Sequence, residues 1–158
     1  MNKTLSIFTF SIILTACSVR QEQSDSTKDT RTTIQKNLLK FAASAKAKNA
    51  DSMLSMFDNS DDIMLIGSDS SEVKRGRKEI RELIQMSLSK PYTINWDFNN
   101  AEIFNSDNVA WAFVNGSAAL LNDNGSEIRI PYRLTSIWIK RGVNWKIKLF
   151  SGSIPGKG

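Results

Sequence analysis

Hydrophobic residues recur every three or four positions in the first half of the chain, which is the spacing of one face of a helix. The segment from Thr30 to about Lys48 places five apolar residues on such a face: Ile34, Leu38, Phe41, Ala42 and Ala45. Asp51 can cap a shorter helix that ends at Phe57. A third amphipathic helix follows Gly76 and must end before Pro91, because proline cannot continue a helix. The pattern predicts three helices.

After Pro91 the hydrophobic period changes from 3.6 to 2, which is typical of half-buried strands. Residues that alternate with polar neighbours form three runs: Ile94, Trp96 and Phe98; Trp111 and Phe113; Ile128, Ile130, Tyr132 and Leu134. Turn-forming segments separate these runs: Asn105–Asn108, Asn122–Gly125 and Arg141–Asn144. A short apolar strand, Ile63–Ile66, precedes the third helix. We therefore predict an α+β domain in which the N-terminal helices pack on one face of a curved antiparallel sheet of four to six strands.

Residues 1–17 have the pattern of an export signal. Lys3 supplies a positive charge, the apolar stretch from Leu5 to Ala16 is too short to span a membrane, and Cys17 follows small residues. This stretch resembles the bacterial lipoprotein signal, in which the cysteine is acylated and becomes the new N-terminus. The resemblance implies a protein that is exported and anchored to a membrane through lipidated Cys17. The alternative is an uncleaved chain in which Cys17 is a buried thiol.

This signal divides the chain into three parts. We expect residues 1–16 to be the signal peptide and residues 17–29 to be the lipidated cysteine and a flexible tether, because the segment after Cys17 is polar and has little surface to bury. Residues 30–158 are expected to form the domain. Ser18, directly after the cysteine, favours a location in the bacterial cell envelope at the outer membrane, facing the periplasm.

Composition restricts the chemistry of the domain. The chain has 21 basic and 16 acidic residues, a formal net charge of +5, no histidine and one cysteine. These absences exclude Ser-His-Asp and Cys-His catalysis and the usual zinc sites, so we expect no metal and no other cofactor. The basic run Lys74–Lys78 has no interleaved aromatic residues, and we therefore expect no nucleic-acid partner. The run predicts a solvated loop and helix start, or a contact with anionic lipid headgroups.

The last strand pair has a threonine and an aromatic residue before a glycine turn, then a tryptophan and a terminal Ser-Gly-x-x-Pro segment. In this chain the pattern is Thr135, Trp138, Gly142, Trp145 and Ser151–Pro155. It resembles the closing hairpin of the nuclear-transport-factor-2-like (NTF2-like) superfamily, which includes the SnoaL-like proteins, and most of all the association domain of calcium/calmodulin-dependent kinase II. The resemblance implies a cone formed by helices and a curved sheet. This superfold carries enzymes, binding modules and oligomerisation domains.

Two further segments bear on this resemblance. Ile66–Asp69, with Glu72 and Gly76, resembles the stretch that SnoaL-like proteins place between their first strand and third helix. Relatives often carry histidines on the last strand, whereas this chain has Lys148 and Phe150 there. An acid-base role of those histidines cannot be transferred to this chain.

The strand from Val109 to Leu121 is apolar on both faces. A sheet with one covered face should alternate apolar and polar residues, so this strand predicts that a partner packs on the outside. The resemblance suggests a second copy of the chain, because such domains commonly dimerise through the outer sheet face. We expect a homodimer.

Large apolar side chains are the candidates for a ligand pocket inside the cone: Phe57, Met64, Trp96, Trp111, Phe113, Tyr132 and Trp138. Among these, Trp111 and Trp138 have small neighbours that could leave room for a ligand. The alternative for each aromatic residue is a place in the packed core.

Acidic residues are the candidates for catalysis. Asp62 and Asp97, with Asp69 and Glu72, could supply a general base if one of them is buried against aromatic side chains. The alternative is that each is a turn or cap residue.

Three function classes follow from these observations. The first is an envelope lipoprotein that binds a small apolar or aromatic ligand, or a partner protein, through an internal pocket. The second is an isomerase, cyclase or dehydratase that uses a pocket carboxylate. The third is a dimeric assembly module.

Overall fold

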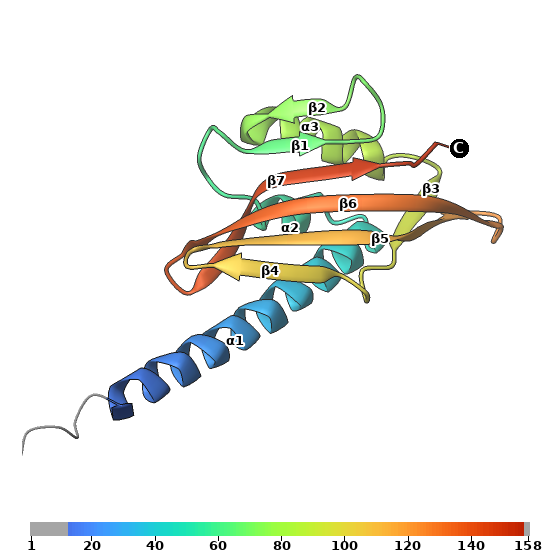
Figure 1. The fold of residues 1–158 in the computed structure, drawn as a ribbon. Coiled ribbons are helices and arrows are strands. Elements are labelled where there is room, and N and C mark those ends of the chain that lie inside the picture. The colour runs from blue at the N-terminus through green and yellow to red at the C-terminus, as the bar shows by residue number, and fades with distance from the viewer. Residues whose placement is uncertain (1–12, 157–158) are drawn as a thin grey trace, which may run out of the picture.

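The part of the chain that the structure describes has three helices: two precede the first strand in the sequence, and the third lies between the second and third strands. The structure is a computed structural model that describes residues 13–156, with side chains from Thr27 onward. The helices are α1 (Ile13–Lys46), α2 (Ala50–Ser55) and α3 (Gly76–Leu88). All five apolar residues of the predicted α1 face are buried. The second half of α1 lies against the concave face of the sheet, while its first half extends away from the sheet (Figure 1). The predicted helical face is confirmed.

The beginning of α1 differs from the prediction. The helix starts at Ile13 rather than near Thr30, so the segment expected to be a flexible tether is helical in the structure. Residues 18–29 contain no glycine or proline, and a helix that already exists on their C-terminal side can be extended without a new nucleus. Residues 1–12 of the expected signal peptide lie outside the described residues.

The cap of α2 also differs. Asn49, and not Asp51, is the N-cap residue, because its Oδ1 accepts the N–H of Ser52 at 2.9 Å. Asp51 instead binds Arg81 of α3 at 2.7 Å. α3 begins at Gly76, whose φ of +68° is a conformation that favours glycine, and it ends before Pro91 as predicted.

Between residues 13 and 156 the sheet has seven strands in the order β2-β1-β7-β6-β5-β3, with β4 also paired to β5. The strands are β1 (Met64–Ile66), β2 (Val73–Arg75), β3 (Tyr92–Trp96), β4 (Glu102–Ser106), β5 (Val109–Asn122), β6 (Glu127–Arg141) and β7 (Asn144–Ser153). The α+β class is confirmed. The sheet has more strands than predicted, and it is mixed, because β1 pairs with β7 in parallel.

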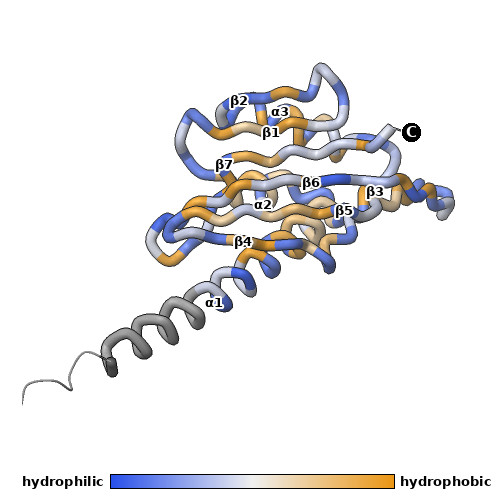
Figure 2. The backbone as a smooth tube through the Cα atoms, in the orientation of Figure 1, coloured by the Kyte–Doolittle hydropathy of each residue, from blue (hydrophilic) through white to orange (hydrophobic). Residues whose placement is uncertain are grey.

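β5 and β6 form the long central hairpin of the sheet, and successive side chains point to its opposite faces. The first half of β5 pairs with β4 and the second half pairs with β3, so the sheet curls around the helices. On the concave face, Ala110 pairs with Trp138 and Ala112 pairs with Ser136, and all four are buried. The small residues of β5 therefore make room for the Trp138 indole. Apolar and polar stretches follow one another along β6 in Figure 2.

Candidate functional site

A cavity of about 270 Å³ lies between the concave sheet face, α1, α3 and the loop that joins β1 to β2. Its floor is aromatic. Phe41 of α1 stacks on Phe150 of β7 at 4.7 Å between ring centroids, and Trp96 of β3 lies 5.8 Å from Phe41 and 6.4 Å from Phe150. Each ring comes from the buried face of its element, because the helical and strand periods direct these side chains inward.

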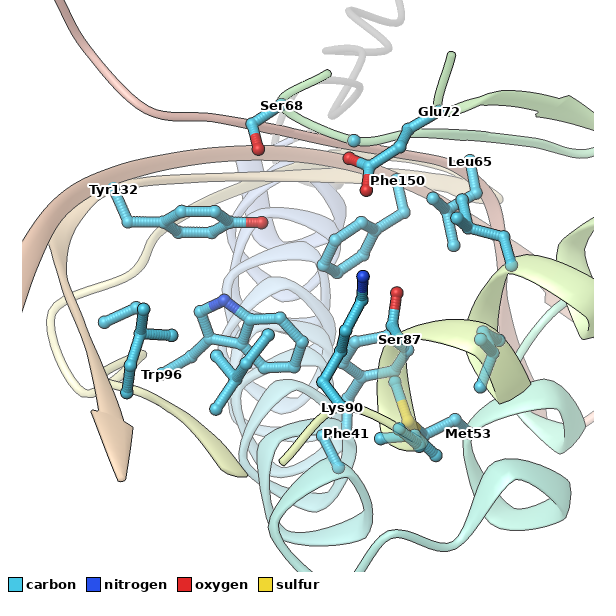
Figure 3. A pocket seen from close by; sticks show the side chains of 18 of the residues that line it. Phe41, Met53, Leu65, Ser68, Glu72, Ser87, Lys90, Trp96, Tyr132 and Phe150 are labelled. Carbon is cyan, nitrogen blue, oxygen red and sulfur yellow. The ribbon is translucent and has the colours of Figure 1, made fainter. Parts of the chain in front are cut away.

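Polar side chains gather at the mouth of this cavity. Ser68 and Glu72 come from the β1–β2 loop, Ser87 and Lys90 from the end of α3, and Tyr132 from β6. Figure 3 shows their oxygen and nitrogen atoms turned toward the cavity above the aromatic floor. The site therefore combines an apolar interior with a ring of hydrogen-bonding and charged groups.

The β1–β2 loop fixes Glu72. Gly67 donates its N–H to the Glu72 carbonyl at 2.9 Å, and Glu72 donates its own N–H to the Asp69 carbonyl at 3.0 Å. The Glu72 Oε2 atom accepts the N–H of Asp69 at 3.2 Å. A Cβ at position 67 would overlap the Glu72 side chain, so the glycine is what allows this carboxylate to fold back over the loop.

Tyr132 presents a neutral hydroxyl to the same cavity. Burial raises the pKa of Tyr132 well above its ordinary value, the charge of Glu72 raises this pKa further, and a hydrogen bond from Trp96 opposes the shift. The phenol is protonated throughout the physiological range and can donate a hydrogen bond.

Comparison with protein families shows the family to which this chain belongs. The family model of the SnoaL-like domain matches residues 34–157, well over half of the sequence. The chain belongs to the SnoaL-like family. The family assignment agrees with the resemblance predicted from the closing hairpin and the Ile66–Asp69 segment. A search of curated proteins finds no significant match for this SnoaL-like domain.

Solved structures share the fold of this SnoaL-like domain. An NTF2-like superfamily protein from Salmonella enterica serovar Typhimurium LT2 is 20% identical, with a TM-score of 0.70 over 82% of this chain and 94% of that one. A candidate scytalone dehydratase from Novosphingobium aromaticivorans DSM 12444 is 12% identical, with a TM-score of 0.71 over 84% and 89% of the two chains. A candidate calcium/calmodulin-dependent protein kinase II association domain from Xanthomonas campestris is 21% identical, with a TM-score of 0.61 over 75% and 82%. At these identities the similarity establishes the fold alone.

Only two of the seven pocket candidates line the cavity of the SnoaL-like domain, namely Trp96 and Tyr132. Phe57 and Trp138 are buried in the core, where the Trp138 Nε1 atom donates to the Ser136 hydroxyl at 2.9 Å. The space beside Ala110 and Ser136 is thus filled by the indole itself. Met64 of β1 does not line the cavity.

Trp111 and Phe113 lie on the outer face of the sheet and are 41% and 37% exposed. The expectation that Trp111 lines the cavity is wrong. From Val109 to Val114 exposed and buried residues alternate along the strand, and the neighbouring alanines, Ala110 and Ala112, take the inward positions. Trp111 stacks instead on Phe104 of β4, with 6.0 Å between the ring centroids.

Asp62 and Asp97, the first two candidates for catalysis, also do not line the cavity. Asp62 forms an ion pair with Lys148, whose hydrogen bond lowers the pKa of this carboxyl, and its side chain is exposed. Asp97 accepts hydrogen bonds from the backbone and side chain of Asn99, the latter at 2.8 Å. The carboxylate that faces the cavity is Glu72, which the sequence placed among the broader set of possible bases.

A polar cluster that the sequence did not predict joins the loop after α2 to the last hairpin. Asp58 is buried and accepts two hydrogen bonds from Arg141, at 3.1 and 3.0 Å, and one from the Ser60 hydroxyl at 2.6 Å. The hydrogen bonds from Arg141 hold the pKa of Asp58 well below its ordinary value. Asp58 and Arg141 are far apart in the sequence, so no local pattern indicates the pair.

Within the part of the chain that the structure describes, no group of three or more Asp, Glu, Cys or His side chains is placed to hold a metal ion. None of the helices described there is long and apolar enough to cross a membrane.

Proposed function

We propose that this SnoaL-like domain binds a small, largely apolar molecule in the cavity between its helices and its sheet. The observation that carries the proposal is an aromatic cavity of about 270 Å³ whose mouth is lined by a few polar groups, the usual design of a small-molecule site. An apolar cavity of about 150 Å³ holds one benzene molecule. By proportion, this cavity has room for a body of about two rings.

The experiment is native mass spectrometry of the purified protein, followed by calorimetric titration with indole as a neutral two-ring probe. A co-purifying small molecule, or saturable binding of indole at one site per chain, supports the proposal. A protein that carries no molecule and shows no heat of binding with indole would contradict it.

A second candidate function is proton transfer of the isomerase or dehydratase kind. It is favoured by one observation, that the Glu72 carboxylate and the protonated Tyr132 hydroxyl face the same cavity. A base and a hydrogen-bond donor on one bound molecule are the minimum for moving a proton next to a carbonyl or hydroxyl. If the wild type converts the co-purified molecule and Glu72→Gln does not, while both proteins bind it, the result supports an enzymatic function over binding alone.

The outer sheet face supports a homodimer. Phe104, Val109, Trp111 and Phe113 are each more than a third exposed and lie together on β4 and the first half of β5. We propose a second copy of the chain as the occupant of this face, because a twofold contact would bury the same apolar residues on both copies.

We propose that the protein is anchored to a membrane of the cell envelope through lipidated Cys17, and the support is the signal-like sequence of residues 1–17. Two or three acyl chains on one cysteine would give a stable anchor, whereas a single chain would not.

A further inference from the structure

Two opposite charges stand at the mouth of the cavity, and they come from different elements. Glu72 belongs to the β1–β2 loop, and Lys90 follows the C-terminal end of α3. Both line the cavity, and Figure 3 shows the carboxylate of one and the amine of the other turned into it. Among the described residues neither side chain forms an ion pair. The mouth thus offers an unneutralised anion and an unneutralised cation to whatever enters.

The backbone on both sides is held in place. The Glu72 carboxylate accepts a hydrogen bond from the Asp69 N–H, and it packs over Gly67, where a side chain would leave no room for it. The Lys90 carbonyl accepts a hydrogen bond from Lys48 Nζ at 3.1 Å, and the following Pro91 restricts the backbone of Lys90. These contacts preorganise the positions from which the two charges act, which lowers the ordering cost of binding.

We infer that the mouth recognises a zwitterionic head group, so that the ligand is an α-amino acid with an apolar side chain or a molecule of the same design. This inference rests on the proposed binding function. An ammonium group would face Glu72 and a carboxylate would face Lys90, each with a charge-assisted hydrogen bond. The Tyr132 hydroxyl adds a donor for the carboxylate.

A head group with a single charge fits this mouth less well. A simple carboxylate gains Lys90 but meets the like charge of Glu72, and a simple ammonium gains Glu72 but meets Lys90. A neutral apolar molecule leaves both charges without a partner. The apolar part of the ligand is accommodated by the floor of Phe41, Trp96 and Phe150, which has space for an indole or a benzyl group.

The test uses the full chain and four probes that share one indole body. Indole carries no charge, tryptamine carries only the ammonium, indole-3-propionate carries only the carboxylate, and L-tryptophan carries both. Calorimetric titration should give an affinity for L-tryptophan at least about tenfold above tryptamine and above indole-3-propionate, the scale expected for one added charge-assisted hydrogen bond in a partly exposed site.

Variants separate the two charges. Glu72→Gln should remove the advantage of L-tryptophan over indole-3-propionate, and Lys90→Gln should remove its advantage over tryptamine. Glu82→Gln and Lys78→Gln, at exposed positions of α3, are the matched controls and should change nothing.

The outcomes distinguish failure of the proposed binding function from failure of the zwitterion inference. If indole does not bind at all, the proposed binding function fails. If indole binds but L-tryptophan binds no tighter than the two singly charged probes, the proposed binding function is supported and the zwitterion inference is overturned. The same holds if either variant tightens L-tryptophan binding, because Glu72 and Lys90 would then be paired with each other and not with a ligand.

Discussion

The hydroxyl of Tyr132 lies so close to the Cα of Gly152 that any side chain at position 152 would overlap it. Tyr132 belongs to β6 and Gly152 to the neighbouring β7, next to the end of the strand. The Ser-Gly-x-x-Pro segment that marks the end of the sequence therefore has a physical role. Its glycine allows the tyrosine to turn its hydroxyl toward the cavity mouth.

Gly152→Ala should force Tyr132 or the backbone of β7 to move. We expect a loss of about 1–3 kcal/mol in the free energy of unfolding, the usual cost of adding a methyl group to a packed site. Urea denaturation measures this loss. Gly156→Ala is the control, because nothing lies within 4 Å of a Cβ at that position. Equal stability of the two variants would show that the Tyr132 hydroxyl is free to shift.

Asp58 should make the stability of the protein depend on pH in acid. Folding lowers the pKa of Asp58, so its charged form stabilises the fold above the unfolded carboxyl pKa of about 3.9. That stabilisation is lost as the pH falls through the depressed pKa of the folded state. Asp58→Asn should therefore cost about 1–3 kcal/mol at neutral pH, less than for a fully buried pair because Arg141 is partly exposed.

The difference between Asp58→Asn and the wild type should shrink as the pH is lowered from about 4 to about 2, because Asp58 takes up a proton in the unfolded state before it does so in the folded state. Thermal unfolding across this range is the measurement. Asp123→Asn, at an exposed position of the β5–β6 turn, should leave the profile unchanged. A constant difference at all pH values would mean that the Asp58–Arg141 pair contributes nothing through its charge.

Trp111→Lys should disrupt the proposed dimer without unfolding the domain. The side chain is 41% exposed, so its replacement removes little from the core, while a lysine on each copy would place like charges in a twofold contact. Sedimentation velocity at micromolar concentration should show dimers for the wild type and monomers for the variant. Val143→Lys, at a 90% exposed turn position, should remain dimeric. A monomeric wild type would remove the dimer proposal.

Cys17→Ser should release the protein from the membrane fraction and leave its unfolding transition unchanged. The reason is that acylation of this thiol is the proposed anchor, and the domain matched by the SnoaL-like family begins only at residue 34. Cell fractionation with a thermal unfolding curve of the released protein tests this. A variant that stays with the membrane, or that no longer folds, would contradict a role as anchor.

Local patterns in the sequence predicted much of the fold. The buried face of α1 from Ile34 to Ala45 and the three hairpin turns follow from spacing and turn chemistry, which are local properties. β2 (Val73–Arg75) was missed because it is short, polar and paired only with β1, so its own residues carry no strand period. The parallel pairing of β1 with β7 joins residues 85 positions apart, such as Met64 and Leu149, and has no local signal.

The site was harder to predict than the fold. The alternation along β5 separates Trp111 from Ala110 and Ala112, but it does not say which face is concave. That depends on which face of the sheet the helices cover, and α1 lies far from β5 in the sequence. Glu72 and Lys90 meet at the cavity only through the packing of the β1–β2 loop on α3, and neither lies in a motif that fixes this packing.

The measurement that tests the binding cavity most directly is indole titration of a variant in which the cavity is filled. Leu120 of β5 lines the cavity, and its register partner Ile128 of β6 is 55% exposed and does not line it. Leu120→Trp should weaken indole binding at least about tenfold, or about 1.4 kcal/mol, because the added indole ring occupies the space of the ligand. Ile128→Trp should bind as the wild type does. Equal indole affinity in all three proteins would contradict ligand binding in this cavity.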